Sequence, residues 1–193
     1  MAQVKRQARP FCHEPKRAKS LEASPTSPND GSQGGCGCVH GDLPRIADCG
    51  FDPIDVLIID FVRCVCAGYA SGETRHWDCA CDLAERELGL VDGPSFVART
   101  ISLMRAIQCE RKGGFGYMAW GCSHVSEHEL LVIALIRAAR QQNTDEFTSA
   151  LSNLASVPNP ARIAIAASAL AGLCIRHESL CSMCGFMGSR VVN

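Results

Sequence analysis

The chain has 193 residues, with 19 basic and 20 acidic side chains and a formal net charge of -1. A balance this close to neutral excludes a strong overall attraction to nucleic acid or to anionic membranes. Aromatic residues make up 6% of the chain, too few for a stacking platform that holds single-stranded nucleic acid.

Residues 1–50 are predicted to form a disordered tail, because they are rich in proline, serine and glycine and poor in large apolar side chains. Such a stretch cannot bury enough surface to offset its conformational entropy. Its basic cluster consists of Lys5, Arg6, Arg9, Lys16, Arg17 and Lys19. We interpret this cluster as part of a solvated tail, and the alternative is a contact with nucleic acid or an acidic partner.

The amino terminus, Met1 to Arg6, contains no apolar stretch of the kind found in signal peptides. No segment reaches about 18 uncharged apolar residues, so no membrane span is expected. These features predict a cytoplasmic protein. In a reducing compartment its 13 cysteines are expected to be buried thiols, metal ligands or redox-active groups rather than disulfides.

From residue 51 to about 178 the apolar spacing predicts an all-α bundle of five or six helices with short connections. Asp52 and Pro53 provide an N-cap and a first-turn proline, and Gly89 marks a break. Ser126 with Glu129 three residues later predicts a capping box. Helices are predicted over residues 53–71, 75–88, 93–111, 126–143, 144–155 and 160–176.

The carboxyl-terminal end carries the strongest candidate metal site, with the spacing C-x2-H-x3-C-x2-C. Its residues are Cys174, His177, Cys181 and Cys184. Thiolates and imidazole suit Zn²⁺, and a C-x2-C turn before a glycine brings two sulfurs to one tetrahedral ion. The alternative is two core residues followed by a loose thiol-bearing end over residues 179–193. A thioredoxin-like redox pair is not predicted, because no βαβ pattern surrounds the motif.

Two further groups are weaker candidates for metal ligands. Cys36, Cys38 and His40 lie in a glycine-rich stretch where packing does not explain three soft ligands so close together. Cys122 and His124 lie on a glycine- and aromatic-rich loop ahead of a predicted helix. His124 also begins an H-x-x-E-H pattern. A peptidase is not predicted, because an N-cap at Ser126 leaves His124 outside the helix.

Four more cysteines belong to predicted helices, as the pairs Cys64/Cys66 and Cys79/Cys81. Residues two apart on a helix point in nearly opposite directions, so neither pair can bind one ion. One member of each pair is expected to face the core. The absence of cysteines repeated one turn apart also argues against copper storage.

The chain resembles a small uncharacterised bacterial all-helical family over roughly residues 54 to 140. The resemblance lies in Arg63, Gly89, Phe96, Arg99, Met104-Arg105 and the run Cys122-x-x-Val125-Ser126-x-x-Glu129-Leu130-Leu131. This chain has Gly121 where the family carries a second loop cysteine, and it lacks the family's basic pair before a proline. The resemblance implies a helical fold and an important Cys122 loop. It implies no activity, because the family has none assigned.

These features predict a non-enzymatic regulatory or adaptor protein that binds another protein and is stabilised by zinc. The prediction is based on the tail, the closed set of four ligands and the lack of a catalytic constellation. The alternative is a metal- or redox-responsive thiol protein in which Cys122, Cys181 and Cys184 change state. The third hypothesis is that the protein is an enzyme.

Overall fold

The computed structural model describes the backbone of residues 42–188 and the side chains of residues 42–177. This part of the chain contains five α-helices, one 3₁₀ helix and no strand longer than an isolated bridge, which confirms the all-α prediction. The elements are η1 (Ile46–Asp48), α1 (Pro53–Ser71), α2 (Arg75–Glu110), α3 (Glu127–Arg140), α4 (Thr144–Leu154) and α5 (Ala161–Gly188).

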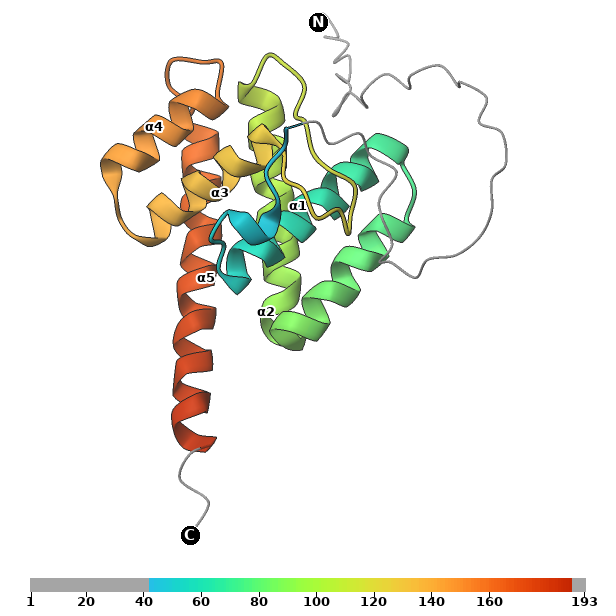
Figure 1. Ribbon diagram of the computed structural model, residues 1–193, viewed down its shortest axis with the longest axis vertical. Coiled ribbons are helices and arrows are strands. Elements are labelled where there is room, and N and C mark those ends of the chain that lie inside the picture. The colour runs from blue at the N-terminus through green and yellow to red at the C-terminus, as the bar shows by residue number, and fades with distance from the viewer. Residues whose placement is uncertain (1–41, 189–193) are drawn as a thin grey trace, which may run out of the picture.

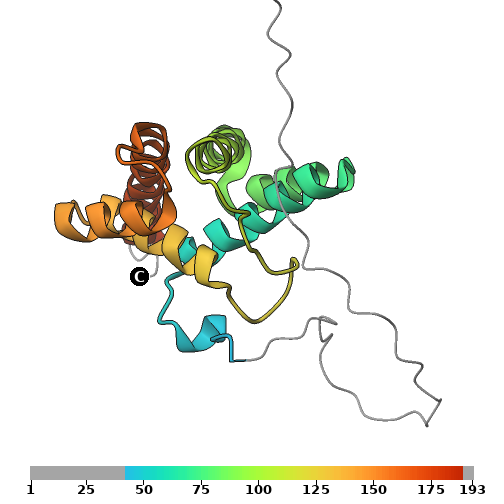
Figure 2. The ribbon, with the colours of Figure 1, turned by 90° about the horizontal axis from the view of Figure 1, so that it is seen from above.

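The helices are arranged around α1 and the second half of α2. In Figure 1, α5 runs alongside the second half of α2 in the opposite direction. The view from above in Figure 2 shows α1, α3 and α4 together on one side of this pair. Ile58, Phe61 and Val65 of α1 are fully buried, so α1 supplies much of the core.

Helix α1 begins as the sequence predicts. The Asp52 carboxylate accepts a hydrogen bond from the Asp55 backbone N–H at 2.8 Å, and the Asp55 carboxylate accepts one from the Asp52 N–H at 3.0 Å. Pro53 occupies the first turn, where a missing N–H costs little. The helix ends at Gly72, whose φ of +71° is the left-handed conformation that glycine adopts easily.

Helix α2 bends at Gly89, where φ is +75° and ψ is 174°. The predicted break at this glycine is therefore present. The prediction that the next helix opens at Gly93 and Pro94 is wrong, because helical structure resumes directly after the bend. Gly93 then packs on the preceding segment: a Cβ there would lie 2.8 Å from the carbonyl oxygen of Ala84.

The capping box of α3 is also confirmed, with Ser126 as N-cap and Glu129 as its partner. Helix α5 extends to Gly188, well past the predicted end at Arg176. Its first turn is capped from α2, because the Glu110 carboxylate accepts hydrogen bonds from the backbone N–H groups of Arg162 and Ile163 at 3.1 and 3.0 Å. No helix within residues 42–188 combines the length and hydropathy that a membrane span requires.

Residues 42–50, which the sequence assigned to the tail, pack against the bundle. Ile46 and Cys49 contact the core, and Arg45 forms an isolated antiparallel bridge with His124. The Ile46 N–H donates to the Ser123 carbonyl at 2.8 Å, and the Val125 N–H donates to the Pro44 carbonyl at 3.0 Å. The folded region thus begins earlier than predicted and holds the loop before α3 from outside.

Candidate functional site

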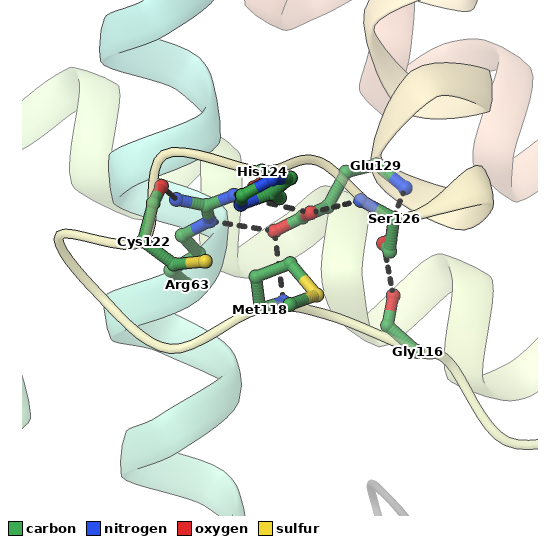
Figure 3. A network of polar contacts seen from close by, with 7 residues as sticks. All are labelled: Arg63, Gly116, Met118, Cys122, His124, Ser126 and Glu129. Atoms are coloured by element: carbon green, nitrogen blue, oxygen red, sulfur yellow. Dashed lines mark hydrogen bonds and ion pairs between the residues drawn. The ribbon is translucent and has the colours of Figure 1, made fainter. Parts of the chain in front are cut away.

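A buried ion pair joins α1 to the start of α3. Arg63 Nε donates to Glu129 Oε1 at 2.8 Å, and the two side chains are 1% and 0% exposed. Figure 3 shows Arg63 reaching from α1 toward the loop that precedes α3. Isolated charges are unstable in such surroundings, so each of these groups depends on the other and on further hydrogen bonds.

The remaining donors of Arg63 bind the loop backbone. Nη1 donates to the carbonyl oxygen of Cys122 at 2.6 Å, and Nη2 donates to that of His124 and, at 3.3 Å, to Glu129 Oε2. A guanidinium is suited to this arrangement because its donors lie in one fixed plane. Arg63 therefore binds Cys122 and His124 through their backbone carbonyl groups.

Glu129 accepts from three chain segments at once. Besides Arg63, its Oε1 accepts from the Met118 N–H at 3.2 Å and its Oε2 from the Ser126 N–H at 2.8 Å. The Ser126 hydroxyl accepts from the Glu129 N–H at 3.2 Å and donates to the Gly116 carbonyl at 2.9 Å (Figure 3). The carboxylate that caps α3 is thus also the counter-ion of the buried arginine.

The chemistry of this cluster is that of a structural, stabilising ion pair. The hollow beside Glu129, between Ile59 and Val132, has no room for a water molecule. Burial raises the pKa of neighbouring Asp60, opposed by the positive charge of Arg63. Because Arg63, the loop backbone and Ser126 use both oxygens of Glu129 and the donors of Arg63, we assign these groups to holding the loop.

His128, at the start of α3, is the second polar anchor of the loop. Its Nδ1 lies 2.6 Å from the Gly116 backbone nitrogen, its Nε2 lies 2.6 Å from Arg111 Nη2, and its ring packs on Phe115. Both polar neighbours are donors, and a doubly protonated ring could accept from neither. Burial lowers the pKa of His128, and the charge of Arg111 lowers it further.

A second ionic cluster joins the amino end of α1 to the carboxyl end of α3. The buried Asp55 carboxylate accepts from Arg137 Nε at 2.7 Å and Arg140 Nη1 at 3.2 Å. Arg140 also donates to Asp52 at 2.8 Å. Burial acts to raise the pKa of Asp52. The hydrogen bonds from Arg140 and the Asp55 backbone, together with the charges of Arg140 and Arg137, outweigh it, and the net pKa is lowered. A hollow of about 410 Å³ beside this cluster is lined by the paired side chains of Asp52, Arg137 and Arg140 and by Gly50, Gln141 and Ile175.

The structure describes the side chains of two residues of the predicted carboxyl-terminal zinc site, Cys174 and His177. Cys174 is buried in the core, and His177 lies one turn later and is partly exposed. The backbone of Cys181 and Cys184 is helical, so the predicted C-x2-C turn is wrong. Their side chains lie outside the described residues. The helix thus replaces the predicted turn, and the zinc site itself stays a prediction.

The other predicted ligands form no metal cluster in the described structure. Cys36, Cys38 and His40 lie outside the described residues. Cys122 is buried, and the His124 ring lies partly exposed with Nδ1 3.3 Å from the Ser123 hydroxyl. Across the described side chains, no three metal-binding groups lie close enough to hold an ion. His124 precedes α3, which confirms that the peptidase-like helix pattern is absent.

The burial of the helical cysteines agrees with the prediction for one pair and differs from it for the other. Cys81 is exposed and Cys79 is partly buried, as expected for one inward-facing member. The prediction is wrong for Cys64 and Cys66, which are both buried because α1 is surrounded by other elements. Burial raises the pKa of the Cys64 thiol to about 12, and Cys79 adds to the effect, so Cys64 is a thiol and not a thiolate near neutral pH.

Sequence reasoning did not identify the Arg63–Glu129 pair. The available signal was an arginine inside the apolar stripe of the first predicted helix, and Glu129 was interpreted only as a capping residue. Both residues contact the loop segment that carries Cys122 and Ser126. Their meeting in one network gives these residues a shared physical role.

The chain matches no protein-family model, no curated protein and no solved structure.

Proposed function

We propose that this chain is a non-enzymatic adaptor that acts by binding another protein. The observation that carries the proposal is the contrast between its interior and its surface. The buried ionic groups of Arg63, Glu129 and Asp55 are used in internal contacts. Large apolar side chains instead face solvent, namely Leu90, Val91, Trp120 and Ile165.

Trp120 makes this contrast clearest on the anchored loop. It is 53% exposed, although the loop on either side is held by His128, Glu129 and Arg63. Tryptophan is among the residues that contribute most to protein–protein binding. A rigid loop that presents one loses little conformational entropy when a partner binds.

The experiment places a photo-crosslinking amino acid at Trp120 or at Ile165 of the full chain in its own cells. Lys112, an exposed polar residue close to the same loop, is the control position. We expect one protein adduct that forms at an apolar position and not at Lys112. The purified partner must then bind the full chain saturably, and Trp120→Ser or Ile165→Ser must weaken that binding at least tenfold. Adducts of equal yield at the control position would overturn the proposal.

Zinc stabilisation remains a proposal supported by the ligand spacing alone. It is tested by the zinc content of full-length protein purified without added metal. One zinc per chain, lost in a Cys181→Ser/Cys184→Ser variant and kept in Cys81→Ser, supports it. A chain that is purified without metal, and whose thermal stability does not change when zinc is added, contradicts zinc stabilisation. The adaptor proposal is unaffected by that result.

A further inference from the structure

A groove of about 420 Å³ lies between the second half of α2 and the first half of α5. Figures 1 and 2 show these helices side by side, with α1, α3 and α4 on one side of the pair. The groove-lining residues recur at helical spacing. On α2 they include Arg99, Ser102 and Cys109, and on α5 they include Arg162 and Ile165.

The walls of the groove are positively charged. Arg99, Arg105 and Arg162 all line it and are exposed, and no acidic side chain is among the lining residues. Within the described region, these three guanidinium groups make no ion pair or hydrogen bond. The neighbouring Glu110 carboxylate is already engaged in capping α5.

The floor of the groove is apolar and shallow. Ala106 and Ala166 are buried beneath it, and Ala169 is half-buried. Ile165 stands at the edge with 71% of its surface exposed. Small residues on two adjacent helices leave room for larger apolar side chains from a third helix, and Ile165 supplies a contact beside them.

Charge decides between the candidate occupants. The chain's own residues 1–41 carry six basic and three acidic side chains, a net charge of 3 with the same sign as the groove. That stretch is a poor ligand for three arginines. Nucleic acid would match the charge, but it would leave Ile165 and the alanine floor without an apolar partner and would find no aromatic ring among the lining residues.

We infer that this groove binds an amphipathic helix of a partner protein, with apolar residues along one face and carboxylates on both flanks. The inference rests on the proposed adaptor function and specifies the kind of partner. Apolar side chains of the helix pack on Ala106, Ala169 and Ile165. Its flanking carboxylates pair with Arg99, Arg105 and Arg162, which favours acidic helices over basic ones.

The test uses the full chain and three fluorescein-labelled 18-residue helical peptides. The first has a leucine face flanked by glutamates, the second has the same face flanked by lysines, and the third has serines in place of the leucines. Binding is followed by fluorescence anisotropy. We expect saturable binding of the first peptide alone, with affinity that falls as salt rises.

Matched variants test the location. Arg105→Glu is compared with Arg176→Glu, because Arg176 is exposed on α5 but outside the groove. Ile165→Ser is compared with Leu90→Ser, since Leu90 is 76% exposed and also outside it. Both groove variants should weaken binding at least tenfold, and both controls should change it less than twofold. Circular dichroism and thermal unfolding establish that all four variants are folded.

Equal binding of the glutamate and lysine peptides, or equal effects of groove and control variants, overturns the inference. Two other results also overturn it. One is binding of a 20-base-pair DNA duplex, in place of the peptide, that depends on Arg105. The other is a dimer, detected by sedimentation, that the Ile165→Ser substitution dissociates.

If the peptide does not bind while crosslinking at Trp120 yields a reconstituted partner, the groove inference fails and the adaptor function stands. If the peptide binds but no cellular partner is found at either position, the adaptor function fails instead.

Discussion

Arg63 and Glu129 lie 66 residues apart in sequence and form a 2.8 Å ion pair with almost no exposed surface. The pair connects α1 to α3 and fixes the loop between α2 and α3 through Met118, Cys122 and His124. The same carboxylate completes the N-terminal cap of α3. Helix capping, loop ordering and helix packing are therefore coupled at one point of the fold.

Replacing one member of this pair should destabilise the protein strongly. Arg63→Met leaves the Glu129 carboxylate buried without its counter-ion, and Glu129→Leu does the same to the guanidinium. We expect each variant to lower the free energy of unfolding by about 3–5 kcal/mol, measured by urea denaturation of the full chain. The exposed Arg86–Glu87 pair provides the control, because Arg86→Met should cost less than about 1 kcal/mol. Equal losses in both pairs would show that burial of the Arg63 pair does not matter.

The bend in α2 makes Gly93 sensitive to a single methyl group. Gly93→Ala places a Cβ 2.8 Å from the Ala84 carbonyl oxygen, and backbone cannot move aside as a side chain can. We expect a loss of about 1–3 kcal/mol in the free energy of unfolding. Gly113→Ala is the matched control, since its Cβ would meet nothing within 4 Å. A Gly93→Ala protein as stable as the Gly113→Ala protein would contradict the close packing at the bend.

His128 should make the fold sensitive to mild acid. Its pKa in the folded state lies below the ordinary value of 6.5, so the unfolded chain takes up a proton at a higher pH than the folded chain. Stability contributed by the neutral ring is therefore complete above that value and declines as the pH falls below it. Measured between pH 7.5 and 5, the stability advantage of wild type over His128→Asn should narrow. An advantage that stays constant over this pH range would contradict a stabilising role of the neutral ring.

The described cysteines should react at very different rates. Cys81 and Cys109 are exposed and should be alkylated first by iodoacetamide. Protection is expected for the buried thiols Cys64, Cys66, Cys122 and Cys174. Peptide mass spectrometry after timed labelling should show that the buried thiols react more slowly than the exposed thiols by a factor on the order of 100 or more. In denaturant the two groups should react at equal rates. Cys64 labelling as fast as Cys81 would contradict the burial that raises the pKa of Cys64 to about 12.

The starts of α1 and α3 were predictable because they depend on nearby residues. Asp52 with Pro53, and Ser126 with Glu129, use donors and acceptors within one turn, and the structure confirms both caps. Helix ends were less predictable. Gly89 bends α2 without ending it, and α5 continues past Arg176. Whether a glycine ends or bends a helix depends on how the following segment packs, which local sequence does not contain.

The candidate site was harder to predict, because its partners are distant in sequence. Arg63 was visible as a charge in an apolar stripe, but nothing in its neighbourhood identifies Glu129 as its counter-ion. The cysteine spacing predicted ligands from side-chain chemistry alone. Cys122 instead contributes its backbone carbonyl to Arg63, a role that any residue type could fill. A spacing pattern cannot distinguish these two uses of one residue.

The buried ion pair of Arg63 matters for the redox chemistry of a chain with 13 cysteines. Its long-range link between α1 and the loop is made of a guanidinium, carbonyl oxygens and a carboxylate, none of which gains or loses electrons. These hydrogen bonds to the loop that carries Trp120 therefore involve no thiol, although Cys122 lies on the same loop.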